Sequence, residues 1–430
     1  MRRKTKNSAV PLLRFPEFGE AGVWNTRTLS EVCRVTQGGT PDTTVDSFWG
    51  GSVQWITPAE MGKGESPYVN RTLRTITEQG LTNCSSELLP ENSVIISTRA
   101  PIGHLAINKS PMAMNQGCRG LIPLPQTDNY FVYCYLLASK SALNDLGSGN
   151  TFKELSGRLL KSFPFTVPIY AEQQKIADCL SSLDELIAAQ ARKVHALKTH
   201  KKGLMQQLFP REGETQPRLR FPEFRGVREW AAISIGDLKP FVTSGSRGWA
   251  AFYADQGELF VRMTNLWRDS INLDLKDSKF VQLPSGANEG LRTRLKEHDV
   301  LISITADIGI IGYVDKSVPF PAYINQHIAL VRFDSAKLCG KYVAYFLASD
   351  ESQRLFRAST DTGSKAGMSL IGIPKIGLKL PSLAEQQRIA DCLTSLDTLI
   401  NTATQALDTL KTHKKALMQQ LFPLAEAVEA

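Results

Sequence analysis

Hydrophobic residues recur every three or four positions in two long stretches of the chain. In the first stretch the periodic apolar positions are Ile176, Leu180, Leu183, Ile187, Val194, Leu197, Leu204 and Leu208. Gln190 and Lys201 occupy two further positions of the same series. A step that averages 3.5 residues over several heptads is typical of helices that pair in a coiled coil. The pattern therefore predicts a long helix over 169–210, between Pro168 and the stop signal at Pro210.

The second stretch repeats this pattern between Pro381 and Pro423. Its apolar positions are Ile389, Leu393, Leu396, Ile400, Ala403, Leu407, Leu410, Leu417 and Leu421, and Lys414 takes the place of Lys201. We expect a second long helix over 382–423. A helix of about 35 residues is roughly 50 Å long, so each stripe needs a long partner, and the two stripes are expected to pair as an antiparallel coiled coil. The alternative is that each helix only covers its own half of the chain as an amphipathic surface helix.

Two landmarks show that the chain is an internal duplication. The run Arg14–Phe18 (RFPEF) recurs as Arg220–Phe224, and the run that starts at Ala171 returns at Ala384. Each copy ends in the motif LKTHKK followed by LMQQLFP, apart from one Gly to Ala change. Such a repeat predicts two equivalent units of roughly 210 residues related by a pseudo-twofold.

The stretches 25–168 and 231–381, between the landmarks, differ strongly in sequence. Short β-rich runs such as 93–97, 300–304 and 328–333 alternate with Gly-rich and Ser-rich loops, and 130–137 and 342–347 have helical patterns. The predicted fold class is α/β (α+β): two mixed α/β domains joined by two long helices. The expected boundaries are 1–168 and 211–381 for the domains, 169–210 and 382–423 for the helices, and 424–430 for a tail.

Composition limits the classes of function. The 430 residues carry a net charge of +8, which only weakly favours a polyanionic partner. No window holds 18 consecutive apolar residues, and Pro11 interrupts any signal peptide, so we expect a cytoplasmic chain with no membrane span. Seven cysteines without a C-x-x-C pair and six scattered histidines predict free thiols and no metal site.

Several loops at corresponding places in the two domains combine Gly with Arg, Asn, Gln or hydroxyl residues. These side chains match base edges in the DNA major groove, and Gly lets the backbone approach phosphate. The candidates in the first domain are Gly38, Gly39, Thr40, Arg99, Asn115, Gln116, Arg119, Asn150, Thr151 and Lys153. Those in the second are Ser246, Arg247, Arg262, Asn265, Asn325, Gln326, His327, Ser364 and Lys365. Taken singly, each residue also fits an ordinary exposed turn.

A basic cluster lies in each predicted helix. Lys198, His200, Lys201 and Lys202 recur as Lys411, His413, Lys414 and Lys415. Both alternatives stay open for them: they face phosphates, or they form a solvated edge.

No catalytic motif is present, so no catalytic residue is predicted. The chain lacks a methyltransferase Asn/Asp-Pro-Pro-Tyr/Phe segment, a phosphate-binding G-x-x-x-x-G-K-[ST] loop and a G-x-S-x-G elbow. We therefore expect a non-catalytic chain that needs no cofactor of its own. The competing hypotheses are a coiled-coil adaptor that binds proteins without DNA specificity and an autonomous DNA enzyme.

The order of motifs resembles the specificity subunit of Type I restriction-modification systems. The first half carries RFPEF, then GGTP at Gly38–Pro41, RAPIG at Arg99–Gly103, NQG at Asn115–Gly117, and EQQKIA at Glu172–Ala177. The second half repeats Ile308-Gly309, Asn325-Gln326 and EQQRIA at Glu385–Ala390. It lacks GGTP, and Thr305-Ala306-Asp307 stands where the first half has an Arg and a Pro. The resemblance covers nearly the whole chain.

This resemblance implies a subunit that recognises double-stranded DNA. Each domain would be a target-recognition domain for one part of a bipartite asymmetric site, and the helices would set the spacer. The helices would also dock two methyltransferase subunits, with restriction and translocase subunits as further partners. S-adenosylmethionine, ATP and Mg²⁺ would belong to those partner subunits.

Overall fold

The computed structural model describes residues 10–62, 66–147, 154–284, 286, 289–358 and 368–423. The chain divides into two compact units. Unit 1 contains residues 1–193 and 403–430, and unit 2 contains residues 194–402. Each unit therefore includes one mixed α/β region and one half of each long helix, α6 (Tyr170–Leu208) and α10 (Leu383–Leu421).

The described part of unit 1 has a five-stranded sheet of order β2-β9-β6-β7-β4, a three-stranded sheet of order β5-β3-β8, and the pair β1-β10. The strands are β1 Asn25–Thr28, β2 Cys33–Gln37, β3 Trp49–Ile56, β4 Tyr68–Val69, β5 Arg74–Ile76, β6 Val94–Ser97, β7 Leu105–Asn108, β8 Met112–Met114, β9 Cys118–Pro123 and β10 Pro164–Val167. The helices besides α6 and α10 are α1 Leu29–Val32, α2 Glu78–Thr82, α3 Asn129–Ala138, α4 Lys140–Asp145 and α5 Gly157–Lys161.

Unit 2, in its described residues, has two four-stranded sheets of order β12-β19-β16-β17 and β13-β15-β14-β18, and the pair β11-β20. The strands are β11 Ala231–Ser234, β12 Phe241–Ser244, β13 Tyr253–Ala254, β14 Glu258–Val261, β15 Lys279–Val281, β16 Val300–Ser303, β17 Ile311–Tyr313, β18 Ala322–Ile324, β19 Ile328–Arg332 and β20 Gly377–Leu380. Its shorter helices are α7 Glu289–Thr293, α8 Gly340–Ala348 and α9 Asp350–Ala358.

The two units share one topology despite their different sequences. The order β2-β9-β6-β7 in unit 1 matches β12-β19-β16-β17 in unit 2, and β5-β3-β8 matches β15-β14-β18. In both units the last pair is parallel: β3 pairs with β8 and β14 with β18. The predicted mixed α/β class is confirmed, and the helical patterns expected at 130–137 and 342–347 lie in α3 and α8.

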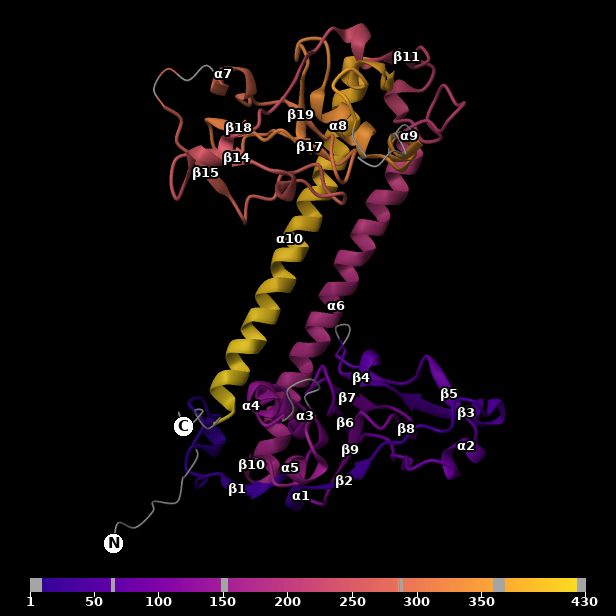
Figure 1. Ribbon diagram of the computed structural model, residues 1–430, viewed down its shortest axis with the longest axis vertical. Coiled ribbons are helices and arrows are strands. Elements are labelled where there is room, and N and C mark those ends of the chain that lie inside the picture. Colours follow the sequence, from indigo (N-terminus) through magenta and orange to yellow (C-terminus); the bar gives the residue numbers. More distant parts are fainter. Residues whose placement is uncertain are drawn as a thin grey trace. The chain divides into compact units, whose positions relative to one another are not determined.

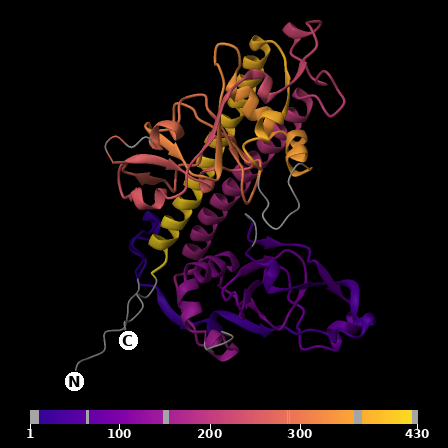
Figure 2. The same cartoon turned by 45° about the horizontal axis from the view of Figure 1, so that its top comes forward.

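The long helices pack against each other in an antiparallel sense. In unit 1 the start of α6, with Ile176 and Leu180, shares a hydrophobic cluster with Leu421 at the end of α10. In unit 2 the start of α10, with Ile389 and Leu393, lies in one cluster with Leu208 at the end of α6. The two helices stay side by side in both views (Figure 1, Figure 2). The predicted antiparallel pairing is confirmed.

Most of the predicted pairing positions are buried in the structure. The buried ones are Ile176, Leu180, Leu183, Ile187, Val194, Leu208, Ile389, Leu393, Ile400, Leu407 and Leu421. Leu197, Leu204, Leu396, Leu410 and Leu417 are half-buried. α6 ends two residues before Pro210 and α10 two residues before Pro423, as the prolines predict, because proline cannot continue the helical hydrogen bonds.

A phenylalanine that follows each long helix completes a hydrophobic core. Phe422, after α10, lies in the core of unit 1, where its ring centroid is 5.5 Å from that of Phe131 and 5.8 Å from that of Tyr135, both in α3. Phe209, after α6, lies in the core of unit 2, 5.8 Å from Tyr342. Burial of one such side chain contributes about 1.5–3 kcal/mol. The repeated LFP motif therefore ties the end of each helix to a core.

Candidate nucleic-acid interface

The two landmarks of the repeat contact each other in unit 1. The Arg14 guanidinium donates to both carboxylate oxygens of Glu172, at 2.8 and 2.7 Å. Trp24 Nε1 donates to the same carboxylate at 3.2 Å. Glu172 is 1% exposed, and its hydrogen bond with Arg14 raises the pKa of the guanidinium. A paired, bidentate geometry of this kind is what makes a buried charge tolerable.

Unit 2 repeats this contact with one difference. Arg220 donates to both oxygens of Glu385 at 2.8 Å, and both side chains are buried. Trp230, the counterpart of Trp24, is also buried, but its Nε1 has no hydrogen-bond partner among the described residues. The first Arg of the RFPEF motif therefore binds the Glu of the EQQ motif in both units.

The first Gln of each EQQ motif joins the start of a long helix to the domain core. Gln173 Oε1 accepts from the Asp128 main-chain N–H at 3.0 Å, and its Nε2 donates to Pro168 O at 3.1 Å. In unit 2, Gln386 Oε1 accepts from the Cys339 N–H at 3.0 Å and Nε2 donates to Pro381 O at 3.0 Å. Each amide thus satisfies backbone groups next to a helix terminus.

A Lys-Asp-Tyr cluster connects the two long helices in each unit. In unit 1, Lys414 Nζ of α10 lies 2.6 Å from both carboxylate oxygens of Asp184 in α6, and the Tyr130 hydroxyl donates to Asp184. Burial raises the pKa of Tyr130, so its hydroxyl stays a donor. In unit 2, Lys201 Nζ lies 2.6 Å from Asp397 Oδ1.

The unit 2 cluster is completed by Tyr345 of α8, whose hydroxyl donates to Asp397 at 2.6 Å. Lys201 and Lys414 occupy the same position of the repeat, as do Asp184 and Asp397. Each Lys therefore pairs with the Asp of the other helix, and a shift in register would leave buried charges unpaired. These clusters explain why a lysine interrupts each hydrophobic stripe.

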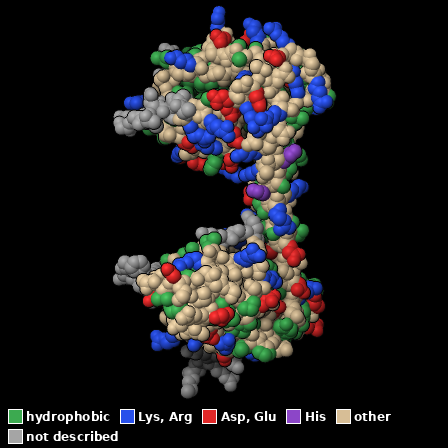
Figure 3. All heavy atoms as spheres, turned by 90° about the vertical axis from the view of Figure 1, so that its right-hand side faces the viewer, with side chains coloured by type: hydrophobic (Ala, Val, Ile, Leu, Met, Phe, Trp, Pro, Cys, Tyr) green, Lys and Arg blue, Asp and Glu red, His purple; other side chains and the backbone are tan. Residues whose placement is uncertain are grey.

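The predicted basic cluster divides between the two alternatives. Lys201 and Lys414 are packed in ion pairs, whereas Lys198, His200 and Lys202 are exposed on α6 and His413 and Lys415 on α10. Lys, Arg and His side chains are visible along the paired helices (Figure 3). Among the exposed members, Lys202 also forms an exposed ion pair with Asp350 at 3.6 Å.

In unit 1 the structure brings five of the predicted loop residues together. This first loop cluster consists of Gly38, Gly39, Thr40, Asn115 and Gln116. Asn115 Nδ2 donates to Thr40 Oγ1 and to Gln116 Oε1, each at 2.9 Å, and Thr40 Oγ1 donates to Gln116 Oε1. A Cβ at Gly38 would lie 1.9 Å from Asn115 O, so only glycine permits this approach.

Two arginines lie beside the first loop cluster. Arg119 Nη1 donates to the main-chain oxygens of Gln116 at 3.3 Å and Cys118 at 3.1 Å. Arg99 follows β6 and forms a half-exposed ion pair with Glu154, at 3.4 Å. Exposed Gln116 and Arg99 thus present hydrogen-bonding groups on loops that a sheet holds in place, as base or phosphate recognition requires.

The equivalent loops of unit 2 form a second loop cluster of Gly245, Ser246, Asn325, Gln326 and His327. A Cβ at Gly245 would lie 2.2 Å from Ile324 O, which repeats the close approach of Gly38. Asn325 Oδ1 accepts from the His327 N–H at 3.1 Å, as Asn115 Oδ1 accepts from the Gly117 N–H at 2.8 Å. The backbone frame is the same, but the side chains that it presents differ.

The side chains of the second loop cluster are positioned by residues that the sequence did not single out. His327 Nδ1 lies 2.6 Å from Thr305 Oγ1, and its Nε2 lies 2.9 Å from Gln326 Nε2. Arg292 donates to Ser246 Oγ at 2.7 Å and to Ser244 O at 2.8 Å. No local pattern links Arg292 to a loop that is distant in the sequence, so only the fold identifies it.

Three further predicted residues of unit 2, Asn265, Arg262 and Arg247, are not members of the second loop cluster as defined above. Asn265 is 1% exposed and donates to Asp274 O at 2.7 Å, and Arg262 donates to Asp277 at 2.8 and 2.9 Å. These two side chains hold a loop together in this structure. Arg247 is exposed next to Ser246. The candidates Asn150, Thr151, Lys153, Ser364 and Lys365 lie outside the described residues.

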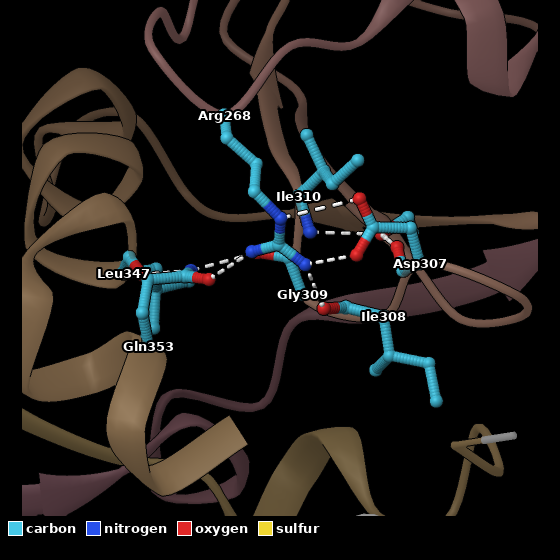
Figure 4. Close-up of polar contacts among 8 residues, drawn as sticks. Arg268, Asp307, Ile308, Gly309, Ile310, Leu347 and Gln353 are labelled. Carbon is cyan, nitrogen blue, oxygen red and sulfur yellow. Dashed lines mark hydrogen bonds and ion pairs between the residues drawn. The ribbon is translucent and has the colours of Figure 1, made fainter. Parts of the chain in front are cut away.

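A further arginine, absent from the sequence-based candidates, fixes the turn after β16 (Figure 4). Arg268 Nε donates to Asp307 Oδ2 at 3.2 Å, Nη2 to Ile308 O at 3.0 Å, and Nη1 to Gln353 Oε1 at 2.7 Å. Gln353 Nε2 in turn donates to Gly309 O at 2.7 Å. Asp307 stands where unit 1 has Pro101, so the departure from the RAPIG motif coincides with a new partner for Arg268.

Groups of metal ligands and membrane-spanning helices are both absent from the described part of the chain. Within these residues no three His, Cys, Asp or Glu side chains are grouped to hold a metal ion. No helix among them combines the length and apolarity needed to span a membrane.

Burial raises the pKa of the Cys33 and Cys118 thiols to about 12.

The family model and the related sequences that match this chain all belong to Type I restriction specificity proteins. The model of the Type I restriction modification DNA specificity domain matches residues 22–199 and 272–412. The MjaIX specificity subunit of a Type I restriction enzyme from Methanocaldococcus jannaschii is 38% identical over 167 residues, 38% of each chain. The EcoR124I/EcoR124II specificity subunit from Escherichia coli is 30% identical over 197 residues, 43% of this chain and 46% of the relative. The chain thus spans less than half the length of these two relatives.

Solved structures show the same fold. The S subunit of a Type I restriction-modification system from M. genitalium matches with a TM-score of 0.60 and 16% identity, over 97% of this chain and 100% of that one. A chain from a structure of complex assembly in the type I R-M system matches with a TM-score of 0.55 and 16% identity, over 93% of this chain and 97% of its own length. With a family model that matches both halves of the duplication, the chain belongs to the Type I restriction modification DNA specificity domain family.

Proposed function

We propose that this chain is the DNA sequence-recognition subunit of a Type I restriction-modification complex. Each unit binds one part of a bipartite asymmetric site through its loop cluster. One observation carries this proposal: two units of the same topology hold their loops by the same Gly-Asn contact but present different side chains. A duplicated scaffold with two dissimilar surfaces is suited to recognise two different half-sites.

The side chains of the loop clusters suit different bases. Unit 1 offers the Thr40, Gln116 and Arg99 side chains, and unit 2 offers Ser246, Arg247 and His327. Amide and guanidinium groups make paired hydrogen bonds to adenine and guanine edges, and each good pair contributes about 1–3 kcal/mol of discrimination. The two half-sites are therefore expected to differ in sequence.

The paired helices act as the spacer element in this proposal. Each has 39 residues, which at about 1.5 Å per residue corresponds to roughly 58 Å, longer than the ~34 Å turn of B-DNA. The helix faces not used for pairing are the proposed docking surface for two methyltransferase subunits. The chain itself is proposed to be non-catalytic, with S-adenosylmethionine, ATP and Mg²⁺ bound by the methyltransferase and translocase subunits.

Exchange of one domain tests the recognition proposal. Residues 25–165 are replaced by the corresponding segment of another family member, and the methylated sites are mapped in cells that carry the partner subunits. One half-site is expected to change while the other half-site and the spacer stay the same. A matched exchange of 231–381 should alter the opposite half-site. If either exchange changed both half-sites or neither, the assignment of one unit to one half-site would be wrong.

A paired deletion tests the spacer proposal. Removing 190–196 and 403–409 takes one heptad from the centre of each helix and keeps both Lys-Asp pairs in register. The helices become about 10 Å shorter, so the spacer should shorten by about three base pairs. An unchanged spacer in the mapped sites would contradict this role of the helices.

A further inference from the structure

Each loop cluster holds a glutamine at the same place in the shared fold. Gln116 is the second residue after β8 and Gln326 the second residue after β18, and these two strands occupy equivalent positions in the two units. The residue that follows the glutamine differs, because unit 1 has Gly117 and unit 2 has His327. A difference in how the two side-chain amides are held is therefore a difference in the hydrogen-bonding groups that they present to a ligand.

The orientation of the Gln116 amide follows from a main-chain donor in unit 1. The Gly117 N–H donates to Asn115 Oδ1 at 2.8 Å, so the other end of that amide, Nδ2, is a donor. Asn115 Nδ2 donates to Thr40 Oγ1 and to Gln116 Oε1, each at 2.9 Å. The Thr40 hydroxyl accepts from Asn115 and passes its own hydrogen to Gln116 Oε1. Since both neighbours are donors, the Gln116 oxygen must face them.

This arrangement leaves Gln116 only donors for a ligand. An amide oxygen has two lone pairs, and Asn115 and Thr40 use one each. Gln116 is exposed, and its Nε2 carries the two hydrogens that this network does not use. A ligand group that meets this side chain must therefore accept a hydrogen bond.

The Gln326 amide has the opposite orientation in unit 2. Gln326 Nε2 lies 2.9 Å from His327 Nε2, and an amide nitrogen can only donate, so the imidazole Nε2 accepts. The hydrogen of the neutral ring is then on Nδ1, which donates to Thr305 Oγ1 at 2.6 Å. Because the nitrogen faces His327, half-buried Gln326 keeps its oxygen and one amide hydrogen for a ligand.

Two residue differences within a common backbone frame account for the reversal. Thr40 is the third residue after β2 and Arg247 the third residue after β12, so the hydroxyl that donates to Gln116 has no counterpart at this position in unit 2. His327, in place of Gly117, brings an acceptor nitrogen to the amide of the preceding glutamine. The frame places the glutamine, and its neighbours determine which end of the amide points inward.

We propose that the two equivalent glutamines select opposite kinds of base, Gln116 a keto base and Gln326 an amino base. In the major groove guanine and thymine offer keto oxygens as acceptors, whereas adenine and cytosine offer amino hydrogens. Adenine suits Gln326 best, because its N7 also accepts the remaining amide hydrogen. This inference rests on the proposed function and adds to it a specificity-determining residue and a class of base for each half-site.

Alanine variants first locate the position that each glutamine recognises. The full chain, assembled with its partner subunits, selects duplexes from a library with randomised half-sites, and the bound DNA is sequenced. Gln116→Ala should remove the preference at one position of one half-site, and Gln326→Ala at one position of the other. The expected loss of preference is on the order of tenfold, as for one base contact.

Glutamate variants then test the direction of each amide. Gln116→Glu keeps an oxygen for Asn115 and Thr40 but replaces the outward amide hydrogens by an oxygen. The preference at its position should therefore change from a keto to an amino base, by about tenfold. Gln326→Glu keeps an outward oxygen, and the neutral imidazole accommodates the new inward oxygen when its hydrogen moves to Nε2. The amino base at this position should stay preferred.

The two glutamate variants are matched controls for each other, because they add the same charge at equivalent positions. Any general loss of DNA affinity by repulsion from phosphates should be similar in both, and only the base preference should differ.

A third variant tests whether His327 is the positioning residue. His327→Gly restores the residue of unit 1 and removes the acceptor that holds the Gln326 nitrogen. The amide then turns freely, so both kinds of base should be selected at this position while the other half-site stays unchanged. In this background Gln326→Glu should narrow the selection to amino bases again. A merely structural role of His327 would not produce this dependence.

The inference is overturned if Gln326→Glu changes the preferred base, if Gln116→Glu leaves it unchanged, or if neither alanine variant affects a position. Failure of the proposed function has a different signature, because the wild-type chain would then select no bipartite sequence at all. A wild type that selects two half-sites, with glutamate variants that shift both in the same direction, would contradict only the inference about the amides.

Discussion

The turn after β6 in unit 1 and the turn after β16 in unit 2 share the hydrogen bonds of a serine but have different surroundings. Ser97 Oγ donates to Pro101 O at 2.6 Å and accepts from the His104 N–H at 2.8 Å. Ser303 Oγ makes the same two contacts, with Asp307 O at 2.5 Å and the Ile310 N–H at 2.8 Å. The turn of unit 1 borders a cavity that Gly103, Lys140 and Asp184 help to line, and the turn of unit 2 is held by Arg268 and Gln353.

This difference shows which parts of a duplicated fold are free to change. The serine and the following glycine satisfy backbone groups inside the turn, so both units keep them. The side chains around the turn do not hold its backbone in both units, so their identities differ between unit 1 and unit 2. The contacts of the long helices are also kept in both units. Arg14 pairs with Glu172 in unit 1, and Arg220 pairs with Glu385 in unit 2.

The largest expected effect comes from breaking the clusters that fix the helix register. Asp397→Ala leaves the Lys201 ammonium buried without its partner and should lower the free energy of unfolding by about 3–5 kcal/mol, measured by urea denaturation. Asp184→Ala should cost a similar amount. The double variant Lys201→Met with Asp397→Leu should recover most of the loss, since it leaves no unpaired charge. A cost below about 1 kcal/mol in both single variants would contradict the role of the pairs.

The next largest effect is expected from substitutions of the glycines at which two loops approach each other closely. Gly38→Ala places a Cβ against main-chain atoms of Asn115, and Gly245→Ala places one against Ile324 O, so each should destabilise by about 1–3 kcal/mol. The two costs should be similar if the two loop clusters share one backbone frame. Gly203→Ala, in α6 with open space around it, is the control and should not destabilise the chain. Thermal unfolding of the three variants checks this.

A smaller effect is expected at the clamp that Arg268 forms in unit 2. Arg268→Ala removes hydrogen bonds that are partly exposed to water, so the free energy of unfolding should fall by about 1 kcal/mol. Amide hydrogen exchange should speed up at 307–310 and stay unchanged at the equivalent turn, 101–104. Equal changes in both turns would mean that Arg268 does not act locally.

The smallest expected effect is the difference in stability cost between substitutions of the two equivalent tryptophans, Trp24 and Trp230. Trp24→Phe removes the hydrogen bond to Glu172 and should cost about 1 kcal/mol more than Trp230→Phe, which removes an N–H that has no partner among the described residues. Chemical denaturation of the two variants measures the difference. Equal costs would show that the Nε1 groups have equivalent environments.

Local patterns were enough to predict the helical frame. The heptad period, the flanking prolines and the return of the Ala171 run at Ala384 identify α6, α10 and their antiparallel pairing, because helix periodicity depends on neighbours within one or two turns. The sequence identified the loops of Gly38 and Asn115 as two separate candidates, but it did not predict that they contact each other. The 2.9 Å contacts of Asn115 with Thr40 and Gln116 depend on sheet order, which no local signal encodes.

The sequence by itself determined the duplication, the helix positions and the residue types offered by the loops. One clue to a longer-range contact was present: Arg14 and Glu172 recur together as Arg220 and Glu385. Only the tertiary structure decided which charges meet, such as Lys414 with Asp184, and which side chains, such as Arg292 and Arg268, position the loops. The reason is physical: periodicity arises from neighbouring residues, whereas ion pairs and loop contacts arise between segments that are distant in the sequence and that only the folded chain brings together.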